Sequence, residues 1–192
     1  MQTLQKFGHE KWTGMPNSVH CGSQTNGHVE KAQPLESIWN AASPLKANLR
    51  VRDHCPYVKA IRDRLIRDCA ELKQHGINSI AIMANDPADY PEDSFDNMKQ
   101  VAAEFGYPFP YVWDESQAVA KTYGAVCTPD FFGFNARLEL QYRGRLDASR
   151  KEAAAADARR DLFEAMLEVA HTGKGPAQQI PSMGCSIKWR EA

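Results

Sequence analysis

The sequence lacks the patterns that assign several large function classes. No stretch approaches the roughly 18 apolar residues needed to cross a bilayer, so we expect no membrane partner. The 23 basic and 24 acidic residues give a net charge of −1, which provides no general attraction for a nucleic acid. Glycine-rich phosphate loops, a GxSxG elbow and the CxxC or HxxxH spacings of zinc sites are also missing. We therefore expect neither a nucleic acid partner nor a metal or other cofactor.

Cysteine usage indicates the cellular compartment. Five cysteines in 192 residues are an odd number in a long chain, which does not favour a disulfide scaffold. Residues 1–15 are polar and contain no apolar segment of a secretory signal. We expect a reduced, cytoplasmic protein with one or two reactive thiols.

The chain divides at about residue 45. Residues 1–44 show neither a helical nor a strand period and are predicted to form a divergent, poorly ordered leader. Strand and helix patterns then alternate and end with a hairpin and a final helix. Strands are expected at 45–52, 77–83 and 110–113, helices at 56–75, 89–105, 115–123 and 157–171, and a hairpin at 131–134 and 138–142. This order predicts an α/β domain over residues 45–173, with a mostly parallel central sheet, an antiparallel C-terminal hairpin and flanking helices, followed by a tail at 174–192.

Cys55 is the strongest candidate for chemistry. It lies where a predicted strand meets a predicted helix, and the unpaired N–H groups and dipole of a helix N-terminus favour an anion there. The thiolate is the nucleophilic form of cysteine. Pro56 suits the first helical position, while Lys59 and a protonated His54 would add positive potential. We predict that Cys55 is the nucleophile and that these three neighbours border its substrate; the alternative is a small residue used only for packing.

The segment Cys127-Thr128-Pro129 is the second candidate. An X-Pro bond just before a strand can be cis, and the strand order places this one beside the start of the first helix. Cys127 is therefore a candidate partner for Cys55. The alternative is an ordinary loop proline with a packed thiol.

Three cysteines remain. Cys185 lies in the tail, and either the tail docks and brings this thiol inward, or the thiol is a bystander on a flexible end. Cys69 lies on the apolar stripe of the first helix and is predicted to pack in the core. Cys21 lies in the leader and has no assigned role.

Several separated motifs carry a family resemblance. They are HCPYVK (54–59), ND (85–86), YPEDS (90–94), FPY (109–111), CTPDFF (127–132) and GCSIKW (184–189). From about residue 53 to residue 190 the chain resembles the thioredoxin-like redoxins of the AhpC/TSA (alkyl hydroperoxide reductase/thiol-specific antioxidant) group. The resemblance implies a thioredoxin-like fold, Cys55 at the active-site helix, Pro129 as a cis proline facing it, and thiol–disulfide or peroxide chemistry.

Two positions depart from the patterns of that group. Val58 occupies the place of the second cysteine in a thioredoxin CxxC motif, and Arg52 stands where peroxiredoxins have Thr or Ser. Intramolecular exchange must therefore use Cys127, Cys185 or an external thiol.

The expected function is that of a thiol oxidoreductase or antioxidant redoxin. The Cys55 thiolate would attack a disulfide or a peroxide, and Cys127 or Cys185 would resolve the intermediate. The backbone of Thr128 and Pro129 would align an extended substrate. The partners would be protein or small-molecule disulfides or peroxides and a cellular thiol reductant. The alternatives are a non-catalytic thioredoxin-fold binding module and a thiol peroxidase.

Overall fold

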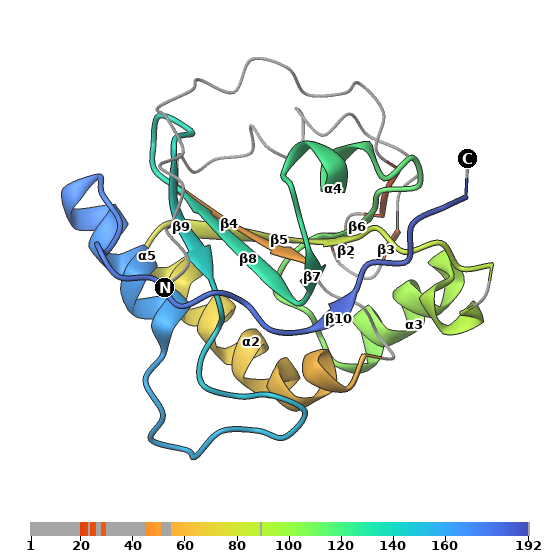
Figure 1. Ribbon diagram of the computed structural model, residues 1–192, viewed down its shortest axis with the longest axis horizontal. Helices are drawn as coiled ribbons and strands as arrows, with labels where there is room; N and C mark the ends of the chain where they lie inside the picture. Colours follow the sequence, from red (N-terminus) through yellow and green to blue (C-terminus); the bar gives the residue numbers. More distant parts are fainter. Residues whose placement is uncertain are drawn as a thin grey trace.

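The protein is described by a computed structural model at residues 20–22, 24–25, 28–29, 45–50, 55–88 and 90–191, and for the first four ranges only the backbone is described. Within these residues a six-stranded sheet has the order β1-β6-β5-β4-β8-β9, and two small sheets pair β10 with β7 and β2 with β3 (Figure 1). The strands are β1 (His20–Gly22), β2 (Gln24–Thr25), β3 (His28–Val29), β4 (Leu45–Arg50), β5 (Ile77–Met83), β6 (Tyr111–Trp113), β7 (Cys127–Thr128), β8 (Asp130–Phe134), β9 (Leu140–Gly144) and β10 (Cys185–Ser186). The helices are α2 (Pro56–Gln74), α3 (Phe95–Glu104), α4 (Ala118–Thr122) and α5 (Asp161–Thr172), with a 3-10 turn η1 (Pro91–Asp93).

The central sheet is parallel only in its middle. β4, β5 and β6 run parallel, whereas β1 on β6, β8 on β4 and β9 on β8 are antiparallel. The predicted α/β class and C-terminal hairpin are confirmed, but antiparallel pairings outnumber parallel ones among the described strands. One edge strand, β1, comes from the segment expected to be a leader.

Helix α2 forms where the sequence predicts it. Pro56 occupies its first turn, where a missing N–H costs nothing. Its buried apolar residues recur every three or four positions, and Gly76, at φ 75°, follows its C-terminal cap. The predicted terminators Gly106 and Gly124 also have positive φ, at 59° and 58°.

Other helices begin later than expected. The Ser94 side chain caps α3 by accepting a hydrogen bond from the N–H of Asn97 at 3.4 Å, so residues 91–93 form the separate turn η1. The short helix α4 starts at Ala118 and α5 at Asp161. Element types are therefore predicted better than element boundaries.

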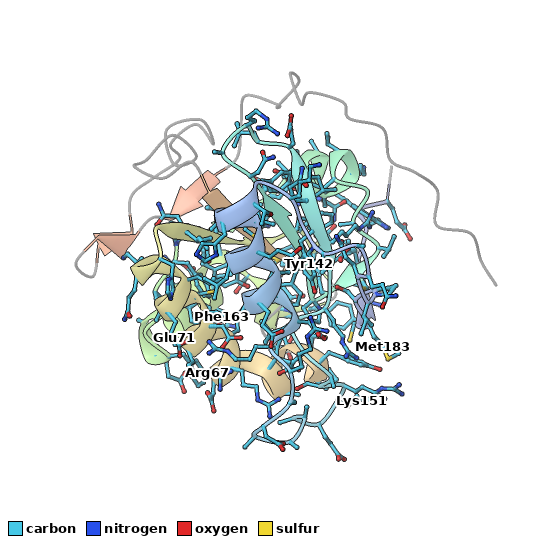
Figure 2. All side chains as sticks on the ribbon, turned by 90° about the vertical axis from the view of Figure 1, so that its left-hand side faces the viewer. Arg67, Glu71, Tyr142, Lys151, Phe163 and Met183 are labelled. Carbon is cyan, nitrogen blue, oxygen red and sulfur yellow. The ribbon has the colours of Figure 1, made fainter. Side chains whose placement is uncertain are left out.

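Two apolar clusters cover the two faces of the sheet. Along β5, Ile77, Ala81 and Met83 join the cluster formed with α2, α3 and α5, whereas Ile80 and Ile82 join the cluster formed with α4. This alternation is the two-residue period of a strand covered on both faces. Where α5 crosses α2, Phe163 and Glu71 lie close together (Figure 2), because Arg160 stacks on the Phe163 ring and pairs with the Glu71 carboxylate.

Candidate active site

Cys55 is the N-cap of α2 and is completely buried. Its carbonyl oxygen accepts hydrogen bonds from the N–H groups of Val58 and Lys59, both at 3.0 Å, and the first turn of the helix carries no acidic side chain. The Cys55 side chain has 0% exposure. Its Sγ contacts the carbonyl oxygen of Thr128 at 3.3 Å and the Sγ of Cys185 at 2.9 Å. The two sulfurs are farther apart than the ~2.05 Å of a disulfide bond and close enough to form one.

The pairing of β8 with β4 brings Pro129, the residue before β8, close to Cys55. β8 pairs with β4 so that Asp130 faces Arg50 at the end of β4 that leads into α2. The Thr128–Pro129 peptide bond just before β8 is cis, as predicted. Pro129 therefore lies beside the start of α2, next to the thiol pair.

Strand β10 lies on β7 as a short antiparallel strand. Cys185 is opposite Thr128, and Ser186 is opposite Cys127. The Thr128 hydroxyl donates a hydrogen bond to the Cys185 carbonyl at 3.4 Å. The backbone at Gly184 lies so close to the backbone of β7 that a Cβ on this residue would collide with the Thr128 carbonyl group. This pairing places the Cys185 thiol on Cys55.

Cys127 has a different environment from its neighbours. Its Sγ donates to the Pro129 carbonyl oxygen at 3.4 Å. Burial, reinforced by the nearby Asp130 carboxylate, raises the pKa of the Cys127 thiol to about 12. This thiol is therefore protonated at neutral pH, and the sulfur that contacts Cys55 is that of Cys185.

The C-terminal side of the tail is held by two buried amide side chains. The Lys188 N–H donates to Asn85 Oδ1 at 3.0 Å, and the Lys188 carbonyl accepts from the Asp86 N–H at 3.0 Å and from Gln117 Nε2 at 2.8 Å. The Arg190 N–H donates to Gln117 Oε1 at 2.8 Å. Gln117 has left-handed backbone geometry, with φ 60°.

The other side of the tail is attached to β9 and the loop after it. The Arg145 N–H donates to the Ile180 carbonyl at 3.0 Å, and the Ser182 hydroxyl donates to the Gly144 carbonyl at 2.5 Å. The tail, drawn in blue, leaves α5, passes β9 and β7, and continues toward the C-terminus (Figure 1). Of the two alternatives for Cys185, the structure shows the docked one.

The structure describes two of the three remaining predicted site residues. Pro56 and Lys59 are exposed on the first turn of α2, and His54 falls outside the described residues. Cys69 is buried in the core as predicted, and burial raises the pKa of its thiol to about 12.

Asn85 and Gln117 were not identified from the sequence as site residues. Asn85 comes just after the buried parallel strand β5. Ligands bind at the carboxyl ends of such strands, so this position could have identified Asn85 as a candidate site residue. Gln117 offers no such signal, because its role depends on an unusual backbone angle.

A cavity of about 130 Å³ lies beside Pro129. It lies between the first turns of α2, the start of β8 and the tail, and its lining includes Tyr57, Ile61, Pro129, Arg145, Pro181 and Met183. Such a volume holds a small group or a few waters. In the described part of the chain, no three His, Cys, Asp or Glu side chains gather to hold a metal ion, and no helix there has the length and apolar character to cross a membrane.

Comparisons with known proteins identify the family and the fold. The sequence pattern that defines the AhpC/TSA family matches residues 48–146. An uncharacterized conserved protein from Geobacillus kaustophilus is 39% identical, with a TM-score of 0.77, over 93% of this chain and 99% of that chain. A hypothetical protein from Sinorhizobium meliloti 1021 is 29% identical, with a TM-score of 0.76, over 93% of this chain and 98% of that chain. Both matches cover more of the chain than residues 45–192 alone can supply, so the similarity extends into the expected leader.

More distant solved structures share the fold. A secreted Mycobacterium tuberculosis disulfide oxidoreductase matches with 12% identity and a TM-score of 0.55, over 79% of this chain and 94% of that chain. A putative thioredoxin and a peroxiredoxin also match. These similarities confirm the thioredoxin-like fold. None of the curated proteins compared with the sequence matches it.

Proposed function

Because this chain belongs to the AhpC/TSA family, we propose that it is a thiol–disulfide oxidoreductase whose redox pair is Cys55 and Cys185. The observation that carries the proposal is the 2.9 Å distance between the two sulfurs at the N-terminus of α2. A helix N-terminus favours the thiolate, which is the attacking form. Cys185 supplies the second thiol that Val58 cannot.

The reaction has two exchange steps. The Cys55 thiolate attacks one sulfur of a substrate disulfide, so that a mixed disulfide forms and one substrate thiolate leaves and takes up a proton. The Cys185 thiolate then attacks the Cys55 sulfur, which releases the second substrate thiol and leaves a Cys55–Cys185 disulfide. The substrate gains two electrons and the protein loses two. A cellular thiol reductant of the cytoplasm, such as glutathione or thioredoxin, would restore the dithiol.

The surrounding residues have supporting roles in this proposal. The Thr128 carbonyl, 3.3 Å from the Cys55 sulfur, and Pro129 would align a substrate that has displaced the tail strand. Pro56 and Lys59 would border the entrance, with His54 immediately before the cysteine. Cys127 would take no part, because its raised pKa keeps the thiol protonated.

Peroxide reduction is a second candidate function, favoured by the family to which the chain belongs. Here the Cys55 thiolate would attack the peroxide, forming a sulfenic acid and releasing an alcohol or water. Cys185 would then condense with the sulfenic acid, releasing water and forming the same disulfide. The two functions therefore share one product and differ in the oxidant.

Mass spectrometry of the mildly oxidised protein tests the proposal. One equivalent of a small disulfide should produce a Cys55–Cys185 link that is lost in Cys185→Ser and retained in Cys127→Ala. A Cys55–Cys127 link, or no intramolecular link, would contradict the assignment. Comparing oxidation rates with hydrogen peroxide and with the disulfide separates the two candidate reactions. A protein that resists both oxidants yet binds an extended peptide would instead be a binding module.

A further inference from the structure

Two buried amide side chains are committed to the tail. Asn85 and Gln117 are each 2% exposed, and buried polar groups require hydrogen-bond partners. The Gln117 oxygen accepts a hydrogen bond from the Arg190 N–H. Its nitrogen donates to two carbonyls, those of Ala84 at 2.7 Å and Lys188 at 2.8 Å. The Asn85 oxygen accepts a hydrogen bond from the Lys188 N–H, while its nitrogen donates to Asp93 Oδ2 at 2.9 Å. Both amide oxygens, together with one bond from the Gln117 nitrogen, therefore have their partners in the backbone of residues 188–190.

Side chains of the same segment add contacts around these amides. Ile187 is buried in the cluster that covers the α4 face of the sheet. The Lys188 ammonium lies 5.5 Å from the centre of the Tyr90 ring, and Arg190 pairs with Asp86 at 3.3 Å. The amides, the ring and the carboxylate together form a socket shaped for residues 187–190, which we call the tail socket.

The segment that occupies the tail socket follows Cys185 closely in the chain. Cys185 is separated from Ile187 by a single residue, so docking of residues 187–190 fixes where the Cys185 sulfur can lie. With the tail docked, Cys55 has 0% exposure. A substrate disulfide cannot reach a sulfur that is completely covered, so the tail must leave Cys55 before the first exchange step.

We propose that Asn85 and Gln117 are positioning residues of a latch, which act by holding residues 187–190. In the open latch, Cys55 is accessible and forms the mixed disulfide with substrate. In the closed latch, Cys185 lies against Cys55 and displaces the substrate thiol. The latch itself rests on the docking contacts, whereas its effect on exchange rests on the function proposed above.

Gln117→Glu is the sharpest test of the latch. The substitution preserves size but replaces the Nε2 donor with an oxygen facing the carbonyls of Ala84 and Lys188, so attraction becomes repulsion. The matched control is Gln100→Glu, the same chemical change at an exposed position of α3. Both are made in a Cys185→Ser background, and alkylation of Cys55 by iodoacetamide is followed by peptide mass spectrometry.

The expected result is at least a tenfold faster alkylation of Cys55 with Gln117→Glu than with Gln100→Glu. The variant loses both hydrogen bonds that Nε2 donates and places a carboxylate oxygen against the same two carbonyls, so the docked tail is destabilised and Cys55 is exposed for more of the time. Equal alkylation rates in the two variants would overturn the latch. If Gln117→Glu does not fold, Ile187→Ala replaces it, with Ile180→Ala, at an exposed tail position, as its control.

Equilibration of the full chain with glutathione buffers tests the effect on exchange. Gln117→Glu should shift the Cys55–Cys185 equilibrium at least tenfold toward the dithiol, because a released tail presents Cys185 less often. An unchanged equilibrium would overturn the positioning role. A wild-type protein that never forms this disulfide would refute the proposed function, while the alkylation difference would still decide whether the latch exists.

Discussion

Replacing Gly184 with alanine should separate Cys185 from Cys55 without removing either thiol. A Cβ at this position would overlap the carbonyl group of Thr128 and come within 2.9 Å of the Pro129 nitrogen. These are backbone atoms beside β8, which is paired on both edges, so they cannot rotate aside as a flexible side chain does. The tail strand β10 must therefore move.

The size of the effect follows from the required movement. Relieving the overlap takes a displacement on the order of 1 Å, and a misplacement of that size can slow a positioned reaction about 100-fold. Forcing extra atoms into a close-packed contact costs about 1–3 kcal/mol. Since the tail is also held at residues 180–182 and 187–190, the change should stay local to β10.

The assay is the rate at which oxidised glutathione converts the reduced protein to the Cys55–Cys185 disulfide, measured by acid quenching and mass spectrometry. Gly106→Ala is the control, because its Cβ meets nothing within 4 Å but its φ of 59° disfavours alanine. It should lower stability by about 1 kcal/mol while leaving disulfide formation unchanged. Disulfide formation at the wild-type rate in Gly184→Ala would refute the positioning argument.

Two further predictions concern stability. Oxidation should stabilise the fold, because a Cys55–Cys185 bond joins residues 130 positions apart and a loop of that length corresponds to about 5 kcal/mol in the chain-entropy model; urea unfolding of the oxidised and reduced forms measures the difference, and a lower midpoint for the oxidised form would contradict it. Alkaline pH should destabilise the reduced protein, because burial raises the pKa of Cys69 from 9.0 to about 12. The folded state keeps a proton that the unfolded chain releases, so this contribution is complete below pH 9.0 and is lost as pH rises toward 12, at about 1.4 kcal/mol per pH unit. Urea unfolding at pH 9 and 10 checks the slope, and Cys69→Ala should reduce it; an identical slope in that variant would refute the assignment.

Much of the fold was predictable because burial imposes a period on the sequence. The alternation along β4 and the apolar run of β5 identify neighbouring strands, and the stripe on α2 identifies the helix between them. The start of α5 was less predictable: a helix is expected from residue 157, but α5 begins at Asp161. In the structure, Arg160 is the N-cap with non-helical backbone angles, and its guanidinium pairs with Asp68 and Glu71 of α2. These tertiary contacts have no local signal in the sequence.

The candidate site was predictable in part for a related reason. Cys55 and Pro129 stand at element boundaries, which leave a pattern in the sequence. The structure favours Cys185 over Cys127 as the partner of Cys55 because Cys185 lies opposite Thr128, and the tail next to it is held by hydrogen bonds between the Asn85 and Gln117 amides and the backbone of Lys188 and Arg190. Contacts of side-chain amides with a distant backbone have no sequence period, and the left-handed angle of Gln117 leaves none either.

The location of the second thiol determines how this site would work. In a CxxC motif both sulfurs belong to one helix turn, so exchange needs no change elsewhere in the chain. Here Val58, buried in the core cluster, fills the position one turn after Cys55, and the sulfur that meets Cys55 comes from a separate segment. In the proposed function, the same contact that would supply the resolving thiol also covers the proposed nucleophile. Substrate entry and disulfide closure would therefore require opposite positions of the tail, and the strength of its docking would set the balance between them.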